Sequence, residues 1–343
     1  MGPRAVALVA GLLLLLLLLS AGRGVGAAYT KATAETALNF ARASYCDAAA
    51  IGGWSCAPCA ANPGLAKVRV FSNASQGTQA FMGVSASRII ASFRGSQNIP
   101  NWIDNLDFYR TSYAKPNCTD CKAHVGFCSA FESLQEAMWE YLQGLVGAHP
   151  TLPLLITGHS LGGAMARLAA ADFASRPYAS GAAPRIELYT FGEPRVGNAA
   201  FANWFLALFC GGGHETFRVT HKRDVVPHLP PAYSGFEHGP HEVWYDNDGS
   251  TSYANCSDVS GTACPAETTA EDAECSNSLL PISIADHLKY LGGCTSCTCV
   301  AGETMSDDLL RISPELEWAI AVDYVYQQER LMKRLSSLSP SFS

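Results

Sequence analysis

The sequence lacks an excess of positive charge, because 23 Lys and Arg face 30 Asp and Glu over 343 residues. This balance argues against nucleic acid as a partner and disfavours docking on an anionic membrane. Charged residues make up only 15% of the chain and hydrophobic residues 48%, which excludes a disordered or collagen-like polymer. Neither an internal repeat nor a long low-complexity stretch follows the N-terminal region, so one domain of about 270 residues is the simplest organisation.

The chain has 13 cysteines, which are too few for a small protein held together by disulfides alone. They are nevertheless more than is usual for a protein of a reducing compartment. The N-terminal residues indicate in which cellular compartment the protein folds. Arg4 is followed by an apolar run over 5–19 and by small residues over 22–28, which predicts a secretory signal peptide over 1–27. A membrane anchor is the alternative, but a span needs roughly 20 apolar residues. We therefore expect a protein that is secreted, or held elsewhere in the secretory pathway, without a permanent membrane anchor.

Removal of residues 1–27 leaves 21 basic against 30 acidic residues, a balance of −9. It removes no cysteine, so all 13 enter an oxidising lumen and one must stay unpaired. Zinc is an alternative for the Cys-x-x-Cys pairs, but disulfides are favoured because a glycosylation sequon at Asn117 overlaps one of them. Cys46 can reach the C-terminal cluster of Cys294, Cys297 and Cys299. The expected local pairs are Cys56/Cys59, Cys118/Cys121 and Cys256/Cys264, and the candidates for the unpaired thiol are Cys128, Cys210 and Cys275. Two further sequons begin at Asn73 and Asn255.

Short apolar strands alternate with helices after the signal peptide, which predicts a mostly parallel sheet covered on both faces. Residues 254–281 are polar and small, and we expect a loop insertion pinned by disulfides. The chain after residue 300 forms a separate C-terminal extension, 301–343, with Pro314 ahead of a helical run. The expected strands cover 87–93, 152–157, 185–191 and 216–220, and the expected helices cover 129–146, 161–174, 199–209 and 315–335.

The central motif is Gly158-His-Ser160-Leu-Gly162, placed between an expected strand and an expected helix. Such a sharp strand-to-helix turn needs small residues two positions before and after the serine. The turn lifts the serine hydroxyl above the sheet edge and aims the N–H of Leu161 at a developing oxyanion. Ser160 is therefore the predicted nucleophile.

A serine nucleophile needs a histidine base and a carboxylate that fixes the tautomer of that histidine. In this type of fold the acid and then the histidine follow the serine along the chain. Asp224 comes just after an expected strand, and His287 lies near the end of the domain. His238 and His241 could be read as a metal pair, but no Glu or Cys completes the set, so we expect no metal and no cofactor.

The chain resembles the fungal-type class 3 lipases of the α/β hydrolase fold, to which feruloyl esterases are closely related. The resemblance spans roughly 34–293 and implies a catalytic domain over 28–300. It implies the triad Ser160, Asp224 and His287, with Ser96 joining Leu161 in the oxyanion hole. It also places Cys118/Cys121 and Cys256/Cys264 at short-range disulfides of relatives, and Cys46 where one pairs with the C-terminus. The matching blocks are Phe93-Arg-Gly-Ser96, 101–106, 124–127, 157–163, 189–198, 217–221, 224–231 and Asp286-His-Leu-Lys-Tyr290.

The segment after Ser96 distinguishes lipases from esterases, because a lipase has a short amphipathic lid helix over its site. Ile99, Trp102, Ile103 and Leu106 follow the spacing i, i+3, i+4, i+7 and form one apolar face. An ordinary core-facing helix would show the same spacing, and the family match at 101–103 favours a lipase-like lid. Pro100 fits the first turn but shortens the helix.

These features together predict a secreted, monomeric serine hydrolase that acts on lipid esters at an oil–water interface, most simply a triacylglycerol lipase. A feruloyl or other soluble-ester esterase would share every catalytic residue and is the first alternative. A catalytically silent lipid-binding protein on the same scaffold is the second, and the complete set of catalytic residues argues against it.

Overall fold

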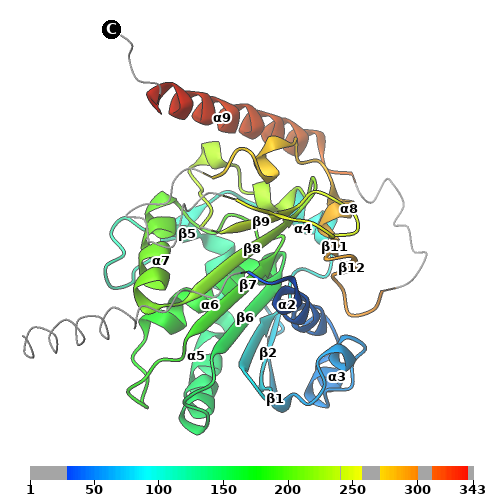
Figure 1. Cartoon of the computed structure of the whole chain (residues 1–343), viewed down its shortest axis with the longest axis vertical. Helices are drawn as coiled ribbons and strands as arrows, with labels where there is room; N and C mark the ends of the chain where they lie inside the picture. Colours follow the sequence, from blue (N-terminus) through cyan, green and yellow to red (C-terminus); the bar gives the residue numbers. More distant parts are fainter. Residues whose placement is uncertain (1–28, 240, 257–270, 300–310, 339–343) are drawn as a thin grey trace, which may run out of the picture.

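The computed structural model describes residues 29–239, 241–256, 271–299 and 311–338. The expected signal peptide and Cys264 lie outside the described residues. The fold is built on an eight-stranded sheet with the order β1-β2-β3-β6-β7-β8-β9-β10 (Figure 1). Its strands are β1 (Ala66–Asn73), β2 (Thr78–Val84), β3 (Ile89–Phe93), β6 (Leu154–His159), β7 (Ile186–Phe191), β8 (Glu215–His221), β9 (Glu242–Tyr245) and β10 (Ala254–Asn255).

The centre of this sheet is parallel from β3 through β6, β7 and β8 to β9, whereas the outer pairings β1-β2, β2-β3 and β9-β10 are antiparallel. The expected α/β hydrolase architecture with a mostly parallel central sheet is confirmed. Because the central strands are parallel, their carboxyl ends meet at one edge of the sheet, where sites of α/β folds are found. The loops after β3, β6, β7 and β8 all start at this edge.

Helices cover both faces of the sheet. One face carries α5 (Val125–Ala148), α6 (Leu161–Ser175) and α7 (Ala199–Gly212), and the other carries α2 (Lys31–Ala43) with the short α3 (Ala48–Gly52) (Figure 1). Burial on both faces explains why β2, β3, β6, β7 and β8 have no exposed residue and why β3 and the start of β6 are apolar at successive positions rather than at alternate ones.

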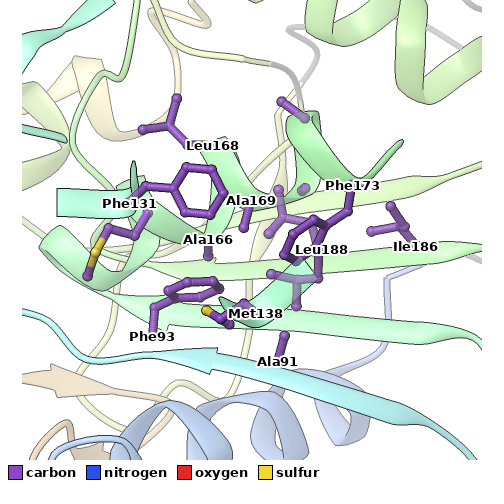
Figure 2. Close-up of a cluster of buried hydrophobic side chains, with 14 of the residues drawn as sticks. Ala91, Phe93, Phe131, Met138, Ala166, Leu168, Ala169, Phe173, Ile186 and Leu188 are labelled. Carbon is purple, nitrogen blue, oxygen red and sulfur yellow. The ribbon is translucent and has the colours of Figure 1, made fainter. Parts of the chain in front are cut away.

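The larger core lies between the sheet and the α5/α6/α7 layer. Figure 2 shows Phe93 of β3 and Leu188 of β7 directed toward Phe131 and Met138 of α5 and toward alanines of α6. The alanines let α6 lie close to the sheet, so the strand that precedes it and the helix itself form a rigid support. The turn between β6 and α6 is held by this support.

Smaller elements complete the edge of the sheet that carries the loops. Two short ribbons are β4 (Arg110–Ser112) with β5 (Lys122–His124), and β11 (Lys289–Tyr290) with β12 (Gly293–Cys294). The short helices are η1 (Pro58–Ala61), α4 (Ile99–Asp104), η2 (Val226–His228), η3 (Ala232–Ser234), η4 (Ser276–Ser278) and α8 (Ile284–His287).

The C-terminal helix α9 (Pro314–Leu338) corrects the expectation of a separate appendage. Its residues Leu316 and Ile320, with Ile312 just before the helix, belong to the same buried cluster as Ile99 and Ile103 of α4. Figure 1 shows α9 lying across the top of the domain. The sequence does not reveal this contact, because the buried side of the helix includes the polar residues Asp323 and Gln327 as well as Leu316 and Ile320. Across the described ranges no helix, α9 included, is long and apolar enough to span a membrane.

The disulfides confirm part of the expected pairing and correct the rest. Cys46 pairs with Cys297, and Cys294 with Cys299, so the structure selects one partner from the C-terminal cluster. Cys56–Cys59 and Cys118–Cys121 form as expected.

The pair Cys256/Cys264 was wrong. Cys256 bonds to Cys275 across a separation of 19 residues, with the two Cα atoms 6.0 Å apart. The sequence favours the shortest loop, whereas the fold decides which Cα atoms come within bonding range. Of the three candidates for the unpaired thiol, the buried Cys128 is free. Cys275 and Cys210 are both disulfide-bonded.

Candidate active site

Ser160 occupies the turn between β6 and α6 with the backbone angles φ 61° and ψ −133°. A positive φ is strained for serine, and such strain is maintained only where the surroundings enforce it. A Cβ on Gly158 would lie 2.1 Å from the carbonyl oxygen of Gly162, and one on Gly162 would lie 2.3 Å from that of Phe93. Both glycines are therefore required for the close passage of strand and helix, which is the geometry of a nucleophile elbow.

Asp224 and His287 meet at the same edge of the sheet. Asp224 follows β8, and His287 ends the short helix α8, whose N-terminus is capped by Ser283. The His287 ring nitrogen Nδ1 lies 2.8 Å from Asp224 Oδ2, and both side chains are buried. Backbone contacts between Arg223 and Ser283 tie the two loops together. Nδ1 therefore donates to the carboxylate, which leaves Nε2 as the available base.

The carboxylate of Asp224 has two further donors, which orient it. The Val226 N–H donates to Oδ1 over 2.8 Å, and the Tyr290 hydroxyl donates to Oδ2 beside His287. Burial, followed by the charge of Asp224, raises the pKa of Tyr290 well above its ordinary value, so the phenol stays protonated as a donor. The sequence showed Tyr290 within a matching block but gave no signal for this contact.

His159, inside the elbow, links Ser160 to the His287 loop. Its Nε2 lies 2.8 Å from the carbonyl oxygen of His287, and its Nδ1 lies 2.9 Å from the Tyr45 hydroxyl. Burial and then the neighbouring His287 lower the pKa of His159 well below its ordinary value. A neutral ring that donates from Nε2 and accepts at Nδ1 satisfies both contacts. The centroids of the two imidazole rings are 4.4 Å apart. His159 therefore packs against His287 and restricts the position of its ring.

Ser160 Oγ and His287 Nε2 are the two unsatisfied atoms of this arrangement. Within the described part of the chain, neither buried atom has a hydrogen-bond partner. Such a pair frequently tightens only when a reacting molecule is bound. Both residues are 0% exposed, so the site is closed to solvent in this conformation.

Ser96 and Leu161 flank the elbow from two sides. Ser96 follows β3, and a Cβ on the intervening Gly95 would lie 2.6 Å from the His159 carbonyl oxygen, so this loop runs directly against the turn. Leu161 is the first residue of α6, where backbone N–H groups are free to bind a negative charge. Both residues line a pocket of about 420 Å³ that also includes Trp102 and Met165.

The helix α4 closes the site, and its apolar face points inward. Ile99 and Ile103 are buried against Val225 and Ile284, which neighbour Asp224 and His287, respectively. The helix has only six residues and Pro100 in its first turn, as Pro100 predicted. Leu106 of the expected apolar face lies beyond the end of the helix, although it and Trp102 still pack against this cluster.

The described residues hold no group of three or more His, Cys, Asp or Glu side chains arranged to bind a metal ion. His238 illustrates why spacing misleads here. It is buried, and its Nε2 lies 2.6 Å from the Pro227 carbonyl oxygen, while His241 Nδ1 contacts the Thr216 carbonyl oxygen. His238 thus contacts η2, and His241 contacts β8.

Comparison with known proteins agrees with this geometry. Residues 90–234 match the family model described as lipase (class 3). The lipase of Rhizomucor miehei is 36% identical over 254 residues, which covers 73% of this chain and 65% of that protein. The secreted mono- and diacylglycerol lipase 1 of Fusarium solani is 32% identical over 231 residues, 65% of this chain and 62% of that protein. The matched region thus spans somewhat less than two thirds of these relatives.

A solved structure overlaps with nearly its whole length. It is a triacylglycerol lipase whose catalytic centre is described as a serine protease triad, and it superimposes with a TM-score of 0.68 at 33% identity. The superposition covers 79% of this chain and 98% of that one. Nearly the whole of that chain is therefore matched by about four fifths of this one.

Proposed function

This chain belongs to the class 3 lipase family, and from that membership we propose that it is a secreted serine hydrolase that cleaves the carboxylic esters of lipids. The observation that carries the proposal is the buried Asp224–His287 pair beside a serine held at positive φ. The names of the relatives favour acylglycerols, with triacylglycerol first, as the substrate class.

The first half of the reaction forms an acyl-enzyme. His287 Nε2 takes the proton of Ser160 while Oγ bonds to the ester carbonyl carbon, and Asp224 stabilises the imidazolium at Nδ1. The N–H groups of Leu161 and Ser96 hold the oxyanion of the tetrahedral intermediate. When the intermediate collapses, the bond to the alcohol breaks and His287 gives its proton to the departing oxygen.

The second half releases the acid. His287 Nε2 removes a proton from a water molecule whose oxygen bonds to the acyl carbon, and the same N–H groups hold the second oxyanion. Collapse breaks the bond to Ser160 Oγ, which recovers the proton from His287. The carboxylic acid leaves and the free enzyme returns without any net change in its own residues.

A fluorophosphonate probe and a substrate panel test this proposal. Covalent labelling of the full secreted chain would exclude a catalytically silent lipid-binding protein. Comparison of triolein with methyl ferulate then separates a lipase from a soluble-ester esterase, and hydrolysis of methyl ferulate alone would contradict the lipase assignment. The rate on phosphatidylcholine in the same panel shows whether phospholipid esters are cleaved as well as acylglycerols.

We propose further that α4 is the lid. It covers the loops of Asp224 and His287 while Ser160 is 0% exposed, so an ester can reach Ser160 only if α4 moves. Its apolar face, once released, would meet the oil phase at an oil–water interface. The enzyme would act there as a monomer, without a cofactor.

Trp102 provides the test of the lid. Its ring stacks on Phe127 with centroids 6.2 Å apart in the closed state and would be exposed to oil in the open state. Trp102→Ala should lower the rate on emulsified triolein by about tenfold, the loss expected for one large interfacial side chain, and change that on a soluble short-chain ester less than twofold. The matched control is Tyr109→Ala, an aromatic residue that is 71% exposed outside α4. Equal losses on both substrates would reject the lid.

Tyr290→Phe tests the positioning of the acid. The variant removes one donor from Asp224 Oδ2 and leaves the Val226 N–H on Oδ1. A hydrogen bond to a charged group contributes about 1.5–3 kcal/mol, so we expect kcat on a soluble ester to fall about tenfold. Tyr245→Phe removes another buried hydroxyl that has a partner, Tyr29, and should leave kcat unchanged.

Secretion is supported by the disulfides and the sequons. Five disulfides join the described residues, with Cys210 also bonded, and such bonds persist in oxidising compartments. Asn117 and Asn255 are exposed and Asn73 lies at the tip of the β1–β2 hairpin, so all three can receive a glycan. Mass spectrometry of the secreted chain before and after deglycosylation would show which ones do.

A further inference from the structure

The outer face of α9 carries an apolar stripe that packs against none of the described core. Trp318, Val325 and Met332 are 68%, 56% and 66% exposed. Their spacing of seven residues places them on one side of the helix. The inner side holds Leu316, Ile320 and Asp323, which are buried. The helix is thus apolar on two opposite sides, and only the inner side packs against a buried cluster of the described residues.

The loop before α8 extends the stripe sideways. Leu280 and Ile282 are 37% and 47% exposed, and together with Trp318 and Ala321 they line a groove of about 600 Å³. Two hydrogen bonds hold η4, which directly precedes this loop, beside α9: the Tyr324 hydroxyl donates to the Ser278 carbonyl oxygen and Gln328 Nε2 donates to the Asn277 carbonyl oxygen. We name Leu280, Ile282, Trp318, Val325 and Met332 the α9 patch.

The α9 patch is connected to the lid through the body of the helix. Ile312, Leu316 and Ile320 pack against Ile99 and Ile103 of α4. The Ser313 N–H also donates to Asp104 Oδ1 over 3.2 Å, at the last residue of α4. A surface that binds the outer face of α9 would therefore lie within one helix diameter of the lid.

The charges and the shape of the patch select its partner. The groove carries one arginine, Arg311, and one glutamate, Glu317, so it has no net charge to attract an anionic membrane, and the whole chain is acidic. The groove at the centre of the patch has a volume of about 600 Å³ and is lined by eight residues, whereas each partner of a stable protein interface contributes roughly 20 residues. Exposed tryptophan beside aliphatic residues is typical of segments that enter a lipid surface.

We propose that the α9 patch docks the protein on an uncharged lipid surface, an acylglycerol droplet, and so holds the lid at the oil–water boundary. The proposal rests on the proposed lipase activity for its substrate, but the docking itself does not require turnover. In this arrangement Trp318, Leu280 and Ile282 enter the droplet surface, and α4 is the next element behind them.

Binding of the full secreted chain to triolein droplets coated with phosphatidylcholine tests the docking. The double variant Trp318→Ser/Ile282→Ser should raise the dissociation constant for these droplets at least tenfold and lower the rate on the same droplets in proportion. Turnover of a soluble short-chain ester and labelling by a fluorophosphonate should stay within twofold of the wild type. Tyr253→Ser, an exposed aromatic residue beside β10, is the matched control and should bind droplets normally.

Two results would overturn the proposal. One is unchanged droplet binding by the double variant. The other is a wild-type chain that dimerises in sedimentation experiments while the variant is monomeric and still binds droplets, which would assign the patch to a second copy. Val325→Ser repeats the test at a separate position should the double variant fold poorly. A wild type that binds droplets but hydrolyses no ester would refute the proposed activity and leave the docking intact.

Discussion

Ser160→Ala should lower kcat on a soluble ester by a factor on the order of 10⁵ to 10⁶, the loss found when a serine nucleophile is removed from a complete triad. The small residual rate would come from the oxyanion donors Leu161 and Ser96, which the variant keeps. Fluorophosphonate labelling should disappear altogether, because Ser160 is the serine that the fold holds in the elbow beside the Asp224–His287 pair.

The structure also predicts that this variant folds normally. Ser160 Oγ has no hydrogen-bond partner among the described residues, so its removal leaves no polar group unsatisfied. The control is Ser175→Ala at the other end of α6, whose hydroxyl donates to the Asp172 carbonyl oxygen far from the reaction. It should keep full activity. Probe labelling that persists in Ser160→Ala would place the nucleophile elsewhere and dismiss the proposed mechanism.

Arg195→Met should be the most destabilising change outside the active site. Arg195 is 0% exposed; it binds Glu271 through two hydrogen bonds of 2.7 and 2.8 Å and Asp323 of α9 through one of 3.0 Å. Burial alone would raise the pKa of Glu271, but Arg195 holds it well below its ordinary value. The variant leaves two buried carboxylates without their cation, which costs about 3–5 kcal/mol.

Urea unfolding of the secreted chain measures this effect, as a lower midpoint with an unchanged slope. Lys31→Met is the matched control, because it breaks an i,i+4 pair with Glu35 at the surface and should cost at most about 0.5 kcal/mol. Adding Glu271→Gln and Asp323→Asn to Arg195→Met should restore part of the lost stability, since the stranded charges are then gone. Should Arg195→Met and Lys31→Met unfold at the same urea concentration, the buried network contributes little.

The Arg195 network joins three segments that are far apart in the chain. Glu271 lies in the polar segment 254–281 and Asp323 lies on α9, and both bind Arg195, which belongs to a family-matching block. The sequence displays the three residues about 50 to 130 positions apart with no pattern that joins them. Pairing of buried charges depends on tertiary packing, so no local period or spacing could have predicted it.

For the helix α4 and for the disulfides, the sequence predicted part of the structure and the fold decided the rest. The spacing of Ile99, Trp102 and Ile103 predicted an apolar face, and the structure shows that this face is covered by α9 as well as by the loops of Asp224 and His287. The spacing of Cys256 and Cys264 predicted a bond, but Cys256 bonds to Cys275. Periodicity reports which side of a helix is apolar, and only the fold determines what lies against it.

The sequence by itself determined the strand-turn-helix around Ser160, because glycines at 158 and 162 are a local steric requirement of that turn. It also indicated Asp224 and His287 as the acid and base, because α/β hydrolases carry these groups after the serine in that order. Only the tertiary structure decided that Tyr290 donates to Asp224 and that His159 supports His287. It also decided that α9 closes over α4, since such contacts join residues far apart in the chain through packing that has no local signature.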